Sequence, residues 1–79
     1  MGGKLSIDMR EYLVGTFQKK LKELRNEKNW NQRDVAEKLS MSHGSYAEYE
    51  TGAEPRFVNL VKIANLYNVT VDFLLGLEN

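Results

Sequence analysis

The same three-part signal for the start of a helix occurs three times in this chain. Each copy has a large apolar residue, then a residue type that caps helix N-termini, then a second apolar residue four positions after the cap. The three copies are Trp30-Asn31 with Val35, Met41-Ser42 with Tyr46, and Val69-Thr70 with Leu74. This spacing is that of the hydrophobic staple, in which the two apolar side chains meet across the cap. Helices are therefore predicted to start near residues 32, 43 and 71.

The segment before these signals predicts a longer helix. Four apolar residues recur there at steps of three and four, which places them on one helical face: Val14, Phe17, Leu21 and Leu24. The helix is expected over residues 10–28, because Asn29 tolerates the left-handed conformation that ends many helices. Asp34, three residues after Asn31, adds a variant of the capping box to the next helix start.

A fourth helix is predicted after Pro55, whose fixed φ suits the first turn of a helix. Over residues 57–67 the buried stripe is expected to consist of Leu60, Ile63, Ala64 and Tyr67. A last helix, ending near Gly76, is expected to face the core with Val71, Leu74 and Leu75. The predicted fold class is therefore all-α, a compact domain of five helices with no strand.

The length and composition narrow the class of protein. At 79 residues the chain is expected to be one small domain with a single modest core. It has no Cys, which excludes a disulfide scaffold and a thiolate nucleophile and suits a reducing cytoplasm. No apolar run could span a membrane and no secretory signal is evident, so we expect a cytoplasmic protein. Residues 1–9 fall outside the helical pattern and are expected to form an N-terminal arm, flexible or partly a cloning remnant, before a domain over 10–79.

Charge is unevenly distributed along the chain. Eleven basic and eleven acidic residues give a formal net charge of zero, which argues against a general polyanion binder. Residues 1–38 hold nine basic and six acidic residues, net +3, whereas residues 39–79 hold two and five, net −3. A phosphate-facing surface should therefore draw mainly on the first half. The lysines of the first helix, taken singly, are expected only to solvate a helix face.

Only about three residues separate the helix predicted over 32–39 from the helix predicted over 43–51. Helices joined so tightly cross at a steep angle, as in a helix-turn-helix, and Ala36 is small where the two axes approach. An ordinary helical corner would have the same spacing. The spacing alone therefore leaves DNA binding open.

Residues 21–75 resemble the Cro/C1-type helix-turn-helix family of phage and bacterial repressors, also called the XRE family. The matching stretches, in this order, are LKELRNEKNWNQRDVAEKLSMS, YAEYETG and VKIANLYNVTVDFLLG. The resemblance implies a λ-repressor-like domain that places its third helix in the major groove, commonly as a dimer on an inverted repeat. The same fold also serves in antitoxins and other regulators, so the resemblance specifies fold more closely than function.

The resemblance implies supporting roles for four residues. Arg25 and Glu50 match a charged pair that the family buries between the first and third helices, where a guanidinium can meet a carboxylate through two parallel hydrogen bonds. Gly52 matches a turn glycine, where a positive φ is favourable only without a Cβ. Gln32 matches a glutamine that contacts a phosphate and supports the reading helix.

Carried onto the third helix, the resemblance implies that His43, Gly44 and Glu48 face the bases, with Ser45 and Thr51 near the sugar-phosphate edge. His43 can donate or accept at a base edge or a phosphate. Glu48 can accept from a cytosine amino group but repels phosphates. The predicted DNA-binding set is Gln32, Arg33, Ser42, His43, Gly44, Ser45, Glu48, Thr51 and Arg56.

This third helix has few groups for reading bases. It contains no Arg or Lys, and Gly44 weakens the helix by about 1 kcal/mol relative to Ala. DNA affinity is therefore expected to depend on the helix N-termini and on three cations, Arg33, Lys38 and Arg56, with DNA shape adding specificity. Tyr46 is expected to belong to the core, whereas for Tyr49 a core position and a stacking role both stay open.

The function expected is that of a dimeric transcriptional regulator that binds specific double-stranded DNA sequences. The alternative is a helix-turn-helix module that acts mainly through protein partners, as an antirepressor or antitoxin-like component, which the zero net charge and Glu48 favour. An enzyme is not expected, because one His, no Cys and no convergent carboxylate pair leave no nucleophile and base. No cofactor, metal or small-molecule ligand is predicted.

The C-terminal stretch VDFLLGLEN offers a dimer interface. Phe73 and Leu77 are expected to point partly outward, because one face of a terminal helix cannot bury all of its apolar residues. A single domain whose third helix has so few base-contacting groups would bind one half-site weakly. Two copies, one helical turn of DNA apart, are therefore expected. Alternatively, Leu77 folds back to cover the core of a monomer.

Overall fold

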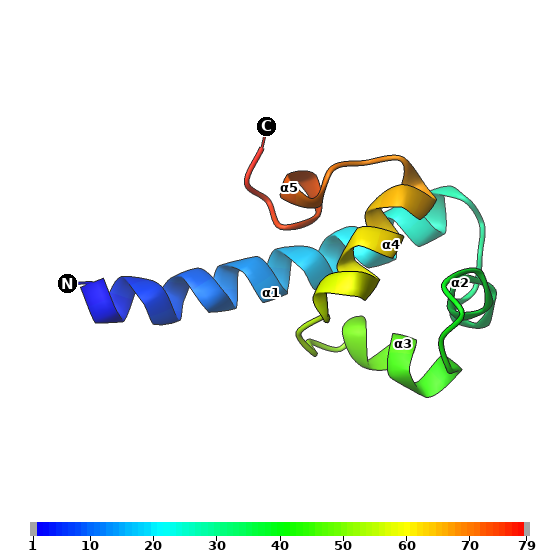
Figure 1. The fold of residues 1–79 in the computed structure, drawn as a ribbon, viewed down its shortest axis with the longest axis horizontal. Helices are drawn as coiled ribbons and strands as arrows, with labels where there is room; N and C mark the ends of the chain where they lie inside the picture. Colours follow the sequence, from blue (N-terminus) through cyan, green and yellow to red (C-terminus); the bar gives the residue numbers. More distant parts are fainter. Residues whose placement is uncertain (1, 79) are drawn as a thin grey trace.

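The computed structural model describes the backbone of residues 2–78 and the side chains of residues 9–78. Over this range the chain forms five helices and no strand, which confirms the predicted all-α class (Figure 1). The helices are α1 (Gly2–Glu27), α2 (Gln32–Lys38), α3 (His43–Tyr49), α4 (Phe57–Tyr67) and α5 (Val71–Leu74). None of the helices in the described part of the chain combines the length and apolar character needed to cross a membrane.

The first helix starts earlier than the apolar periodicity predicts. Its backbone is helical from Gly2, so α1 includes most of the predicted arm. The division of the chain into an arm over 1–9 and a domain over 10–79 stays a prediction. Met1 and Asn79 lie outside the described residues.

The three predicted helix starts are confirmed, and each has its cap. Asn31 and Asp34 form a complete capping box, in which each side chain accepts from the other's backbone N–H at 2.8 and 2.9 Å. Ser42 accepts from the backbone N–H of Ser45, and Thr70 accepts from that of Phe73. The apolar residue four positions after each cap is fully buried: Val35, Tyr46 and Leu74. Local side-chain chemistry therefore fixes where α2, α3 and α5 begin.

Left-handed residues end three of these segments. Asn29 has a φ of 58°, as predicted, and Asn68 ends α4 with a φ of 55°. Ser40, in the turn between α2 and α3, has a φ of 56°, which is unusual for a residue with a Cβ. Gly52 has a φ of 114° in the turn after α3, where its lack of a Cβ avoids strain. These positions set the directions in which the short helices leave one another.

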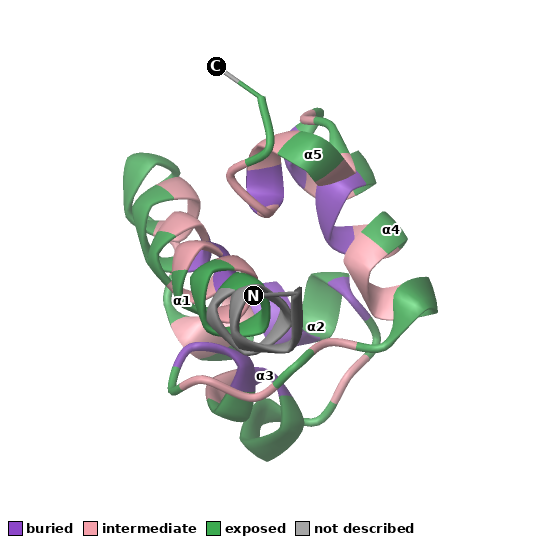
Figure 2. Ribbon diagram, turned by 90° about the vertical axis from the view of Figure 1, so that its left-hand side faces the viewer, coloured by how far each residue is buried: buried purple, intermediate pink, exposed green. Residues whose placement is uncertain are grey.

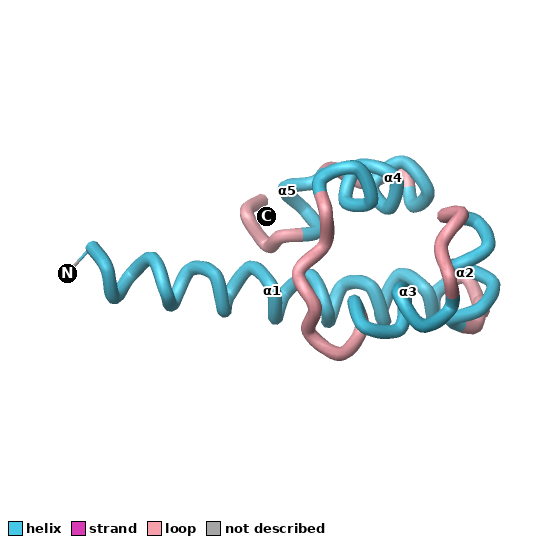
Figure 3. The backbone as a smooth tube through the Cα atoms, turned by 60° about the horizontal axis from the view of Figure 1, so that its bottom comes forward, coloured by secondary structure: helices cyan, strands magenta, loops and turns pink. Residues whose placement is uncertain are grey.

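The core lies where the C-terminal half of α1 meets the other helices, and their inner sides are buried there (Figure 2). α2 packs against α3, and α5 packs against both α1 and α4. The loop from α3 to α4 runs past α1 before α4 begins (Figure 3). The residues with no exposed surface are Phe17, Leu21, Val35, Tyr46, Ile63 and Leu74. This arrangement holds α3 at the edge of the domain with its outer side open to solvent.

Candidate nucleic-acid interface

A buried ion pair lies behind α3. Arg25, near the end of α1, donates from Nε to Oε2 of Glu50 at 2.7 Å and from Nη2 to Oε1 at 3.0 Å. Its third donor, Nη1, bonds the backbone carbonyl of Trp30 at 3.1 Å. The Glu50 side chain is 2% exposed and the Arg25 side chain 17%. The paired fork of hydrogen bonds therefore ties the end of α3 to α1 in one orientation.

Two more donors complete the hydrogen bonding of Glu50. The buried Tyr46 hydroxyl donates to Oε2, and Gln32 donates from Nε2 to Oε1 at 3.1 Å. Burial alone would raise the pKa of Glu50, but the hydrogen bonds from its three side-chain donors outweigh burial and lower it. The hydrogen bond to Glu50 raises the pKa of Arg25, and burial raises that of Tyr46. Glu50 is thus held as an ionised carboxylate within the fold.

Gln32 links this buried group to the surface of α3. Its Oε1 lies 3.2 Å from Nε2 of His43, the first residue of α3. His43 itself is exposed. The first predicted base-facing residue is therefore connected through one amide to the buried ion pair.

The outer side of α3 is open. A Cβ added at Gly44 would meet nothing within 4 Å, and Ser42, Ser45 and Glu48 are all exposed. A cleft of about 480 Å³ beside α3 is lined by four of the predicted DNA-binding residues, Ser42, Ser45, Glu48 and Arg56. Within it the Ser42 and Ser45 hydroxyls are 2.9 Å apart. The structure therefore brings Arg56 from the start of α4 next to the third helix.

The other predicted contacts lie around this cleft rather than in it. Thr51 is exposed, and its hydroxyl donates to the backbone carbonyl of Glu48 at 3.1 Å. Arg33 is exposed on α2. Lys38 is also exposed, but its Nζ lies 4.6 Å from the centre of the Trp30 ring, so it already has an aromatic partner. Arg33 and Arg56, in contrast, have no acidic or aromatic partner among the described residues.

Both tyrosines of α3 are core residues. Tyr46 has no exposed surface, which confirms its predicted position. Tyr49 is 7% exposed, meets the ring of Phe17 edge-on at 5.9 Å, and accepts a hydrogen bond from Asn59 at 2.9 Å. A stacking role for Tyr49 is therefore wrong.

The two predicted dimer residues, Phe73 and Leu77, differ in how far they are exposed. Leu77 is 54% exposed, so it does not fold back over the core. Phe73 is half-buried, and the ammonium of Lys20 lies 4.3 Å from its ring centre. Tyr12, also 54% exposed, donates its hydroxyl to the Gly76 carbonyl at 2.7 Å. Tyr12, Phe73 and Leu77 are called the C-terminal surface below.

Sequence reasoning missed a second apolar surface. Phe57 is 87% exposed, Val58 70% and Val61 50%, all on the outer side of α4. The helical spacing could have revealed it, because these residues lie on the opposite side from the predicted buried stripe of the same helix. These three residues are called the α4 surface below.

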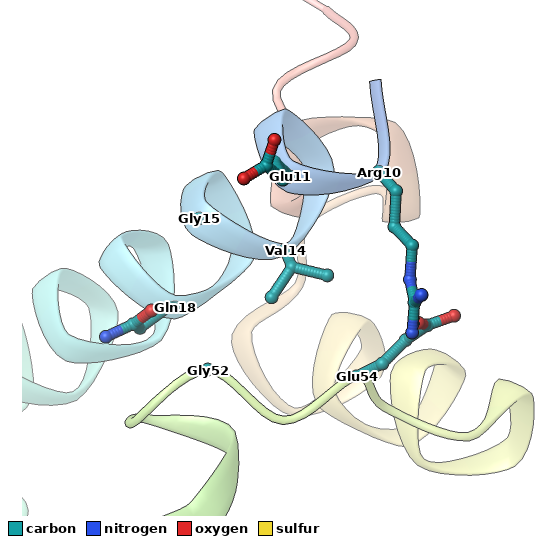
Figure 4. A pocket seen from close by; sticks show the side chains of 7 residues that line it. All are labelled: Arg10, Glu11, Val14, Gly15, Gln18, Gly52 and Glu54. Carbon is teal, nitrogen blue, oxygen red and sulfur yellow. The ribbon is translucent and has the colours of Figure 1, made fainter. Parts of the chain in front are cut away.

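A hollow of about 600 Å³ lies between α1 and the loop after α3 (Figure 4). Arg10 crosses its rim and pairs with Glu54 at 2.7 Å, and both side chains are well exposed. Val14 and Gly15 form its α1 side, with Gly52 opposite. Its one cation, Arg10, is paired with an acid, so the lining offers no unpaired positive charge. Among the described residues no group of His, Cys, Asp and Glu could hold a metal ion.

Comparisons with known proteins agree with this geometry. Residues 21–74 match the profile of a family described as helix-turn-helix. The HTH-type transcriptional regulator ImmR of Bacillus subtilis (strain 168) is 41% identical over 59 residues, which are 73% of this chain and 46% of that protein. The HTH-type transcriptional regulator AnsR of the same organism is 40% identical over 60 residues, 75% of this chain and 52% of that protein.

A third relative is described as an SPbeta prophage-derived uncharacterized HTH-type transcriptional regulator, YonR, also of Bacillus subtilis (strain 168). It is 38% identical over 60 residues, 75% of this chain and 56% of that protein. The chain thus spans about half the length of the curated relatives it matches. No solved structure matches the chain.

Proposed function

This chain belongs to the Cro/C1-type helix-turn-helix family, and from that membership we propose that it is a cytoplasmic transcriptional regulator that binds specific double-stranded DNA sequences. α3 enters the major groove, and α2 crosses the backbone. The named relatives are transcriptional regulators, and the family is not an enzymatic one.

The observation that carries this proposal is the contrast between the two sides of α3. Its inner side is fixed by Arg25, Tyr46 and Gln32 around one buried carboxylate. On its outer side a Cβ added at Gly44 would meet nothing within 4 Å, and the small or polar side chains there are exposed. A rigid, open helix of this kind can enter a groove without rearranging the domain.

The proposed contacts divide by chemistry. Gln32, Arg33 and Arg56 meet phosphates, with Ser42, Ser45 and Thr51 at the sugar-phosphate edge. His43, Gly44 and Glu48 face the bases. Lys38 is left out of this set because it lies over Trp30.

The proposed regulator acts as a homodimer. The support lies in the sparse reading side of α3 and in the exposed apolar groups of the C-terminal surface, Tyr12 and Leu77 above all. A two-fold dimer would place two copies of α3 one helical turn apart on an inverted repeat.

Selection of genomic fragments by the purified protein, followed by titrations at several salt concentrations, tests DNA binding. Two cations per subunit, Arg33 and Arg56, predict four neutralised phosphates in a dimer and a slope of about −4 for log K against log salt. An Arg33→Gln, Arg56→Gln variant should lose most of that slope. If no fragment is enriched and binding does not depend on salt, the proposal fails.

The α4 surface favours a second candidate, a module that acts mainly through protein partners. Three exposed apolar side chains gather on one short helix, and an apolar patch of this kind is typical of a protein–protein contact. This candidate predicts that substitution of the α4 surface abolishes function while DNA binding is absent or independent of salt.

Sedimentation equilibrium shows whether the C-terminal surface or the α4 surface forms the dimer interface. The parent should be dimeric, and a Phe73→Glu, Leu77→Glu variant should be a folded monomer with much weaker binding to a full operator. Val58→Glu on the α4 surface is the matched control and should leave the dimer intact. A parent that stays monomeric at high concentration with DNA present would rule out the proposed dimer, and a monomer produced by Val58→Glu alone would move the interface to α4.

A further inference from the structure

One glutamine amide lies between a buried carboxylate and the first residue of the reading helix. Gln32 Nε2 is 3.1 Å from Glu50 Oε1, and Gln32 Oε1 is 3.2 Å from His43 Nε2. Glu50 in turn accepts hydrogen bonds from Nε and Nη2 of Arg25. A continuous chain of hydrogen bonds thus runs from the inside of the domain to the exposed imidazole.

The chemistry of these groups gives the chain a fixed direction. An ionised carboxylate only accepts hydrogen bonds, so the amide nitrogen of Gln32 must face Glu50. The amide oxygen then faces His43, and a carbonyl oxygen also only accepts. Nε2 of His43 must therefore carry the proton. Exchanging the two ends of the amide would place an oxygen against the Glu50 carboxylate, so the opposite direction is excluded.

We propose that this row of hydrogen bonds fixes neutral His43 as the Nε2–H tautomer. Its bare Nδ1 then reads an exocyclic amino group of cytosine or adenine in the major groove. The proposal rests on the DNA binding proposed above. A neutral imidazole has one donor and one acceptor nitrogen, so a donating Nε2 makes Nδ1 the acceptor. Nδ1 has no hydrogen-bond partner within the described part of the chain, and the side chain is exposed.

This tautomer selects among the contacts open to a histidine. Phosphate oxygens and the O6 and N7 atoms of guanine only accept, so a bare Nδ1 cannot bond them. The groups in the major groove that donate are the N4 amino group of cytosine and the N6 amino group of adenine. His43 is thereby assigned to bases rather than to the backbone, and to two of the four bases.

The tautomer can be measured directly, because the chain contains a single histidine. A long-range proton–nitrogen NMR spectrum at pH 8.5, above the range in which histidine side chains titrate, then shows one imidazole. The free parent protein should show the Nε2–H form alone. Gln32→Leu keeps a side chain of similar size without the amide and should raise the population of the Nδ1–H form. An Nδ1–H parent, or identical spectra for two folded proteins, would overturn the assignment.

The base contact is tested on the selected operator at the same pH. The base pair read by His43 is the one whose preference disappears in His43→Ala, and the parent should prefer cytosine or adenine there. Replacing that base by 2-pyrimidinone or purine, which lack the amino group, should weaken parent binding about tenfold and leave His43→Ala unchanged. A preference for guanine, or no position that depends on His43, would refute the contact.

Failure of the proposed function can be told apart from failure of this assignment. If the protein selects no DNA, the base contact is overturned together with DNA binding, while the nitrogen spectrum still decides the tautomer. If DNA is bound with a steep salt dependence but His43→Ala keeps every preference, only the base contact is overturned.

Discussion

The inner and outer sides of α3 are built from opposite kinds of contact. On the inner side, Glu50 accepts from three side chains, and one of them, Arg25, also bonds a backbone carbonyl of the next loop. On the outer side, Gly44 has no side chain and Glu48 carries the only formal charge. The orientation of the helix is therefore specified by many groups, and the DNA readout that we propose for it by few.

This difference suggests a division of labour. A helix with few base-reading groups discriminates DNA only if each group is held in one place, because a mobile side chain can adapt to a wrong base. The buried hydrogen bonds supply that rigidity for His43 through Gln32. Perturbing the inner side should therefore affect both stability and specificity, whereas changing a charged side chain on the outer side should affect only the interaction with DNA.

The largest effect is expected from Arg25→Ala. Removing the guanidinium leaves the 2% exposed carboxylate of Glu50 without its cation, which should lower the free energy of unfolding by roughly 3 kcal/mol. Urea melts of parent and variant at pH 7 measure it. A shift within experimental error would mean that the pair contributes nothing and that apolar packing alone orients α3.

The pH dependence gives this variant a second readout. In the parent, folding lowers the pKa of Glu50 below its ordinary value of 4.5. The ionised carboxylate therefore stabilises the protein above pH 4.5, and this stabilisation is lost as pH falls through the lower folded-state pKa. The parent should lose stability across that acid range. In Arg25→Ala the loss should be smaller, since the hydrogen bonds of the guanidinium no longer lower the pKa of Glu50.

A smaller effect is expected from the two buried tyrosines, which form a matched pair. Tyr46→Phe removes a hydroxyl that donates to Glu50 and should cost about 2 kcal/mol, because hydrogen bonds to charged groups are the stronger ones. The Tyr67 hydroxyl is buried with no hydrogen-bond partner in the described chain, and burial raises its pKa to about 12. Tyr67→Phe removes a buried hydroxyl that makes no hydrogen bond, so it should raise the free energy of unfolding by about 1 kcal/mol. Equal costs in urea melts would show that the Glu50 contact is not what distinguishes Tyr46.

The fold and the buried contacts behind α3 were predictable from the sequence only where the signals are local. Cap residues such as Asn31 and Thr70 act on the backbone three positions away, so sequence spacing locates them. The pairing of Arg25 with Glu50 came from the resemblance to a family. The bond between Gln32 and His43 was not predicted, because it depends on how the turn at Ser40 directs the two helices.

Other features escaped prediction for different physical reasons. Residues 2–9 fall outside the predicted helix, yet the backbone stays helical through them, because extending an existing helix needs no new nucleation. Ser40 adopts a left-handed φ that its residue type does not favour, so only the surrounding packing can impose it. Lys38 was expected at phosphates, and its contact with Trp30 depends on the fold rather than on the spacing of the two residues.

On the outer side, Glu48→Gln should alter DNA binding without altering stability. The change removes the charge that repels phosphates, so binding to unrelated DNA should strengthen. If Glu48 accepts from a cytosine, preference at that base pair should fall by about 1.5 kcal/mol. Titrations against the selected operator and its single-base variants measure both. No change on any DNA would mean that α3 does not enter the groove.

The smallest effect, and the one that tests the outer side of α3 most directly, is expected from Gly44→Ala. A Cβ at this position meets open space, so the variant should gain about 1 kcal/mol in unfolding free energy from helix propensity alone. Gly15→Ala is the matched control, since Gly15 also lies within a helix and also has open space around its Cβ. Both variants should be more stable than the parent in urea melts, but only Gly44→Ala should shift base preference, towards a thymine whose methyl group the new side chain can contact. If the two variants bind every DNA alike, residue 44 does not face the bases, and the outer side of α3 is not the reading surface.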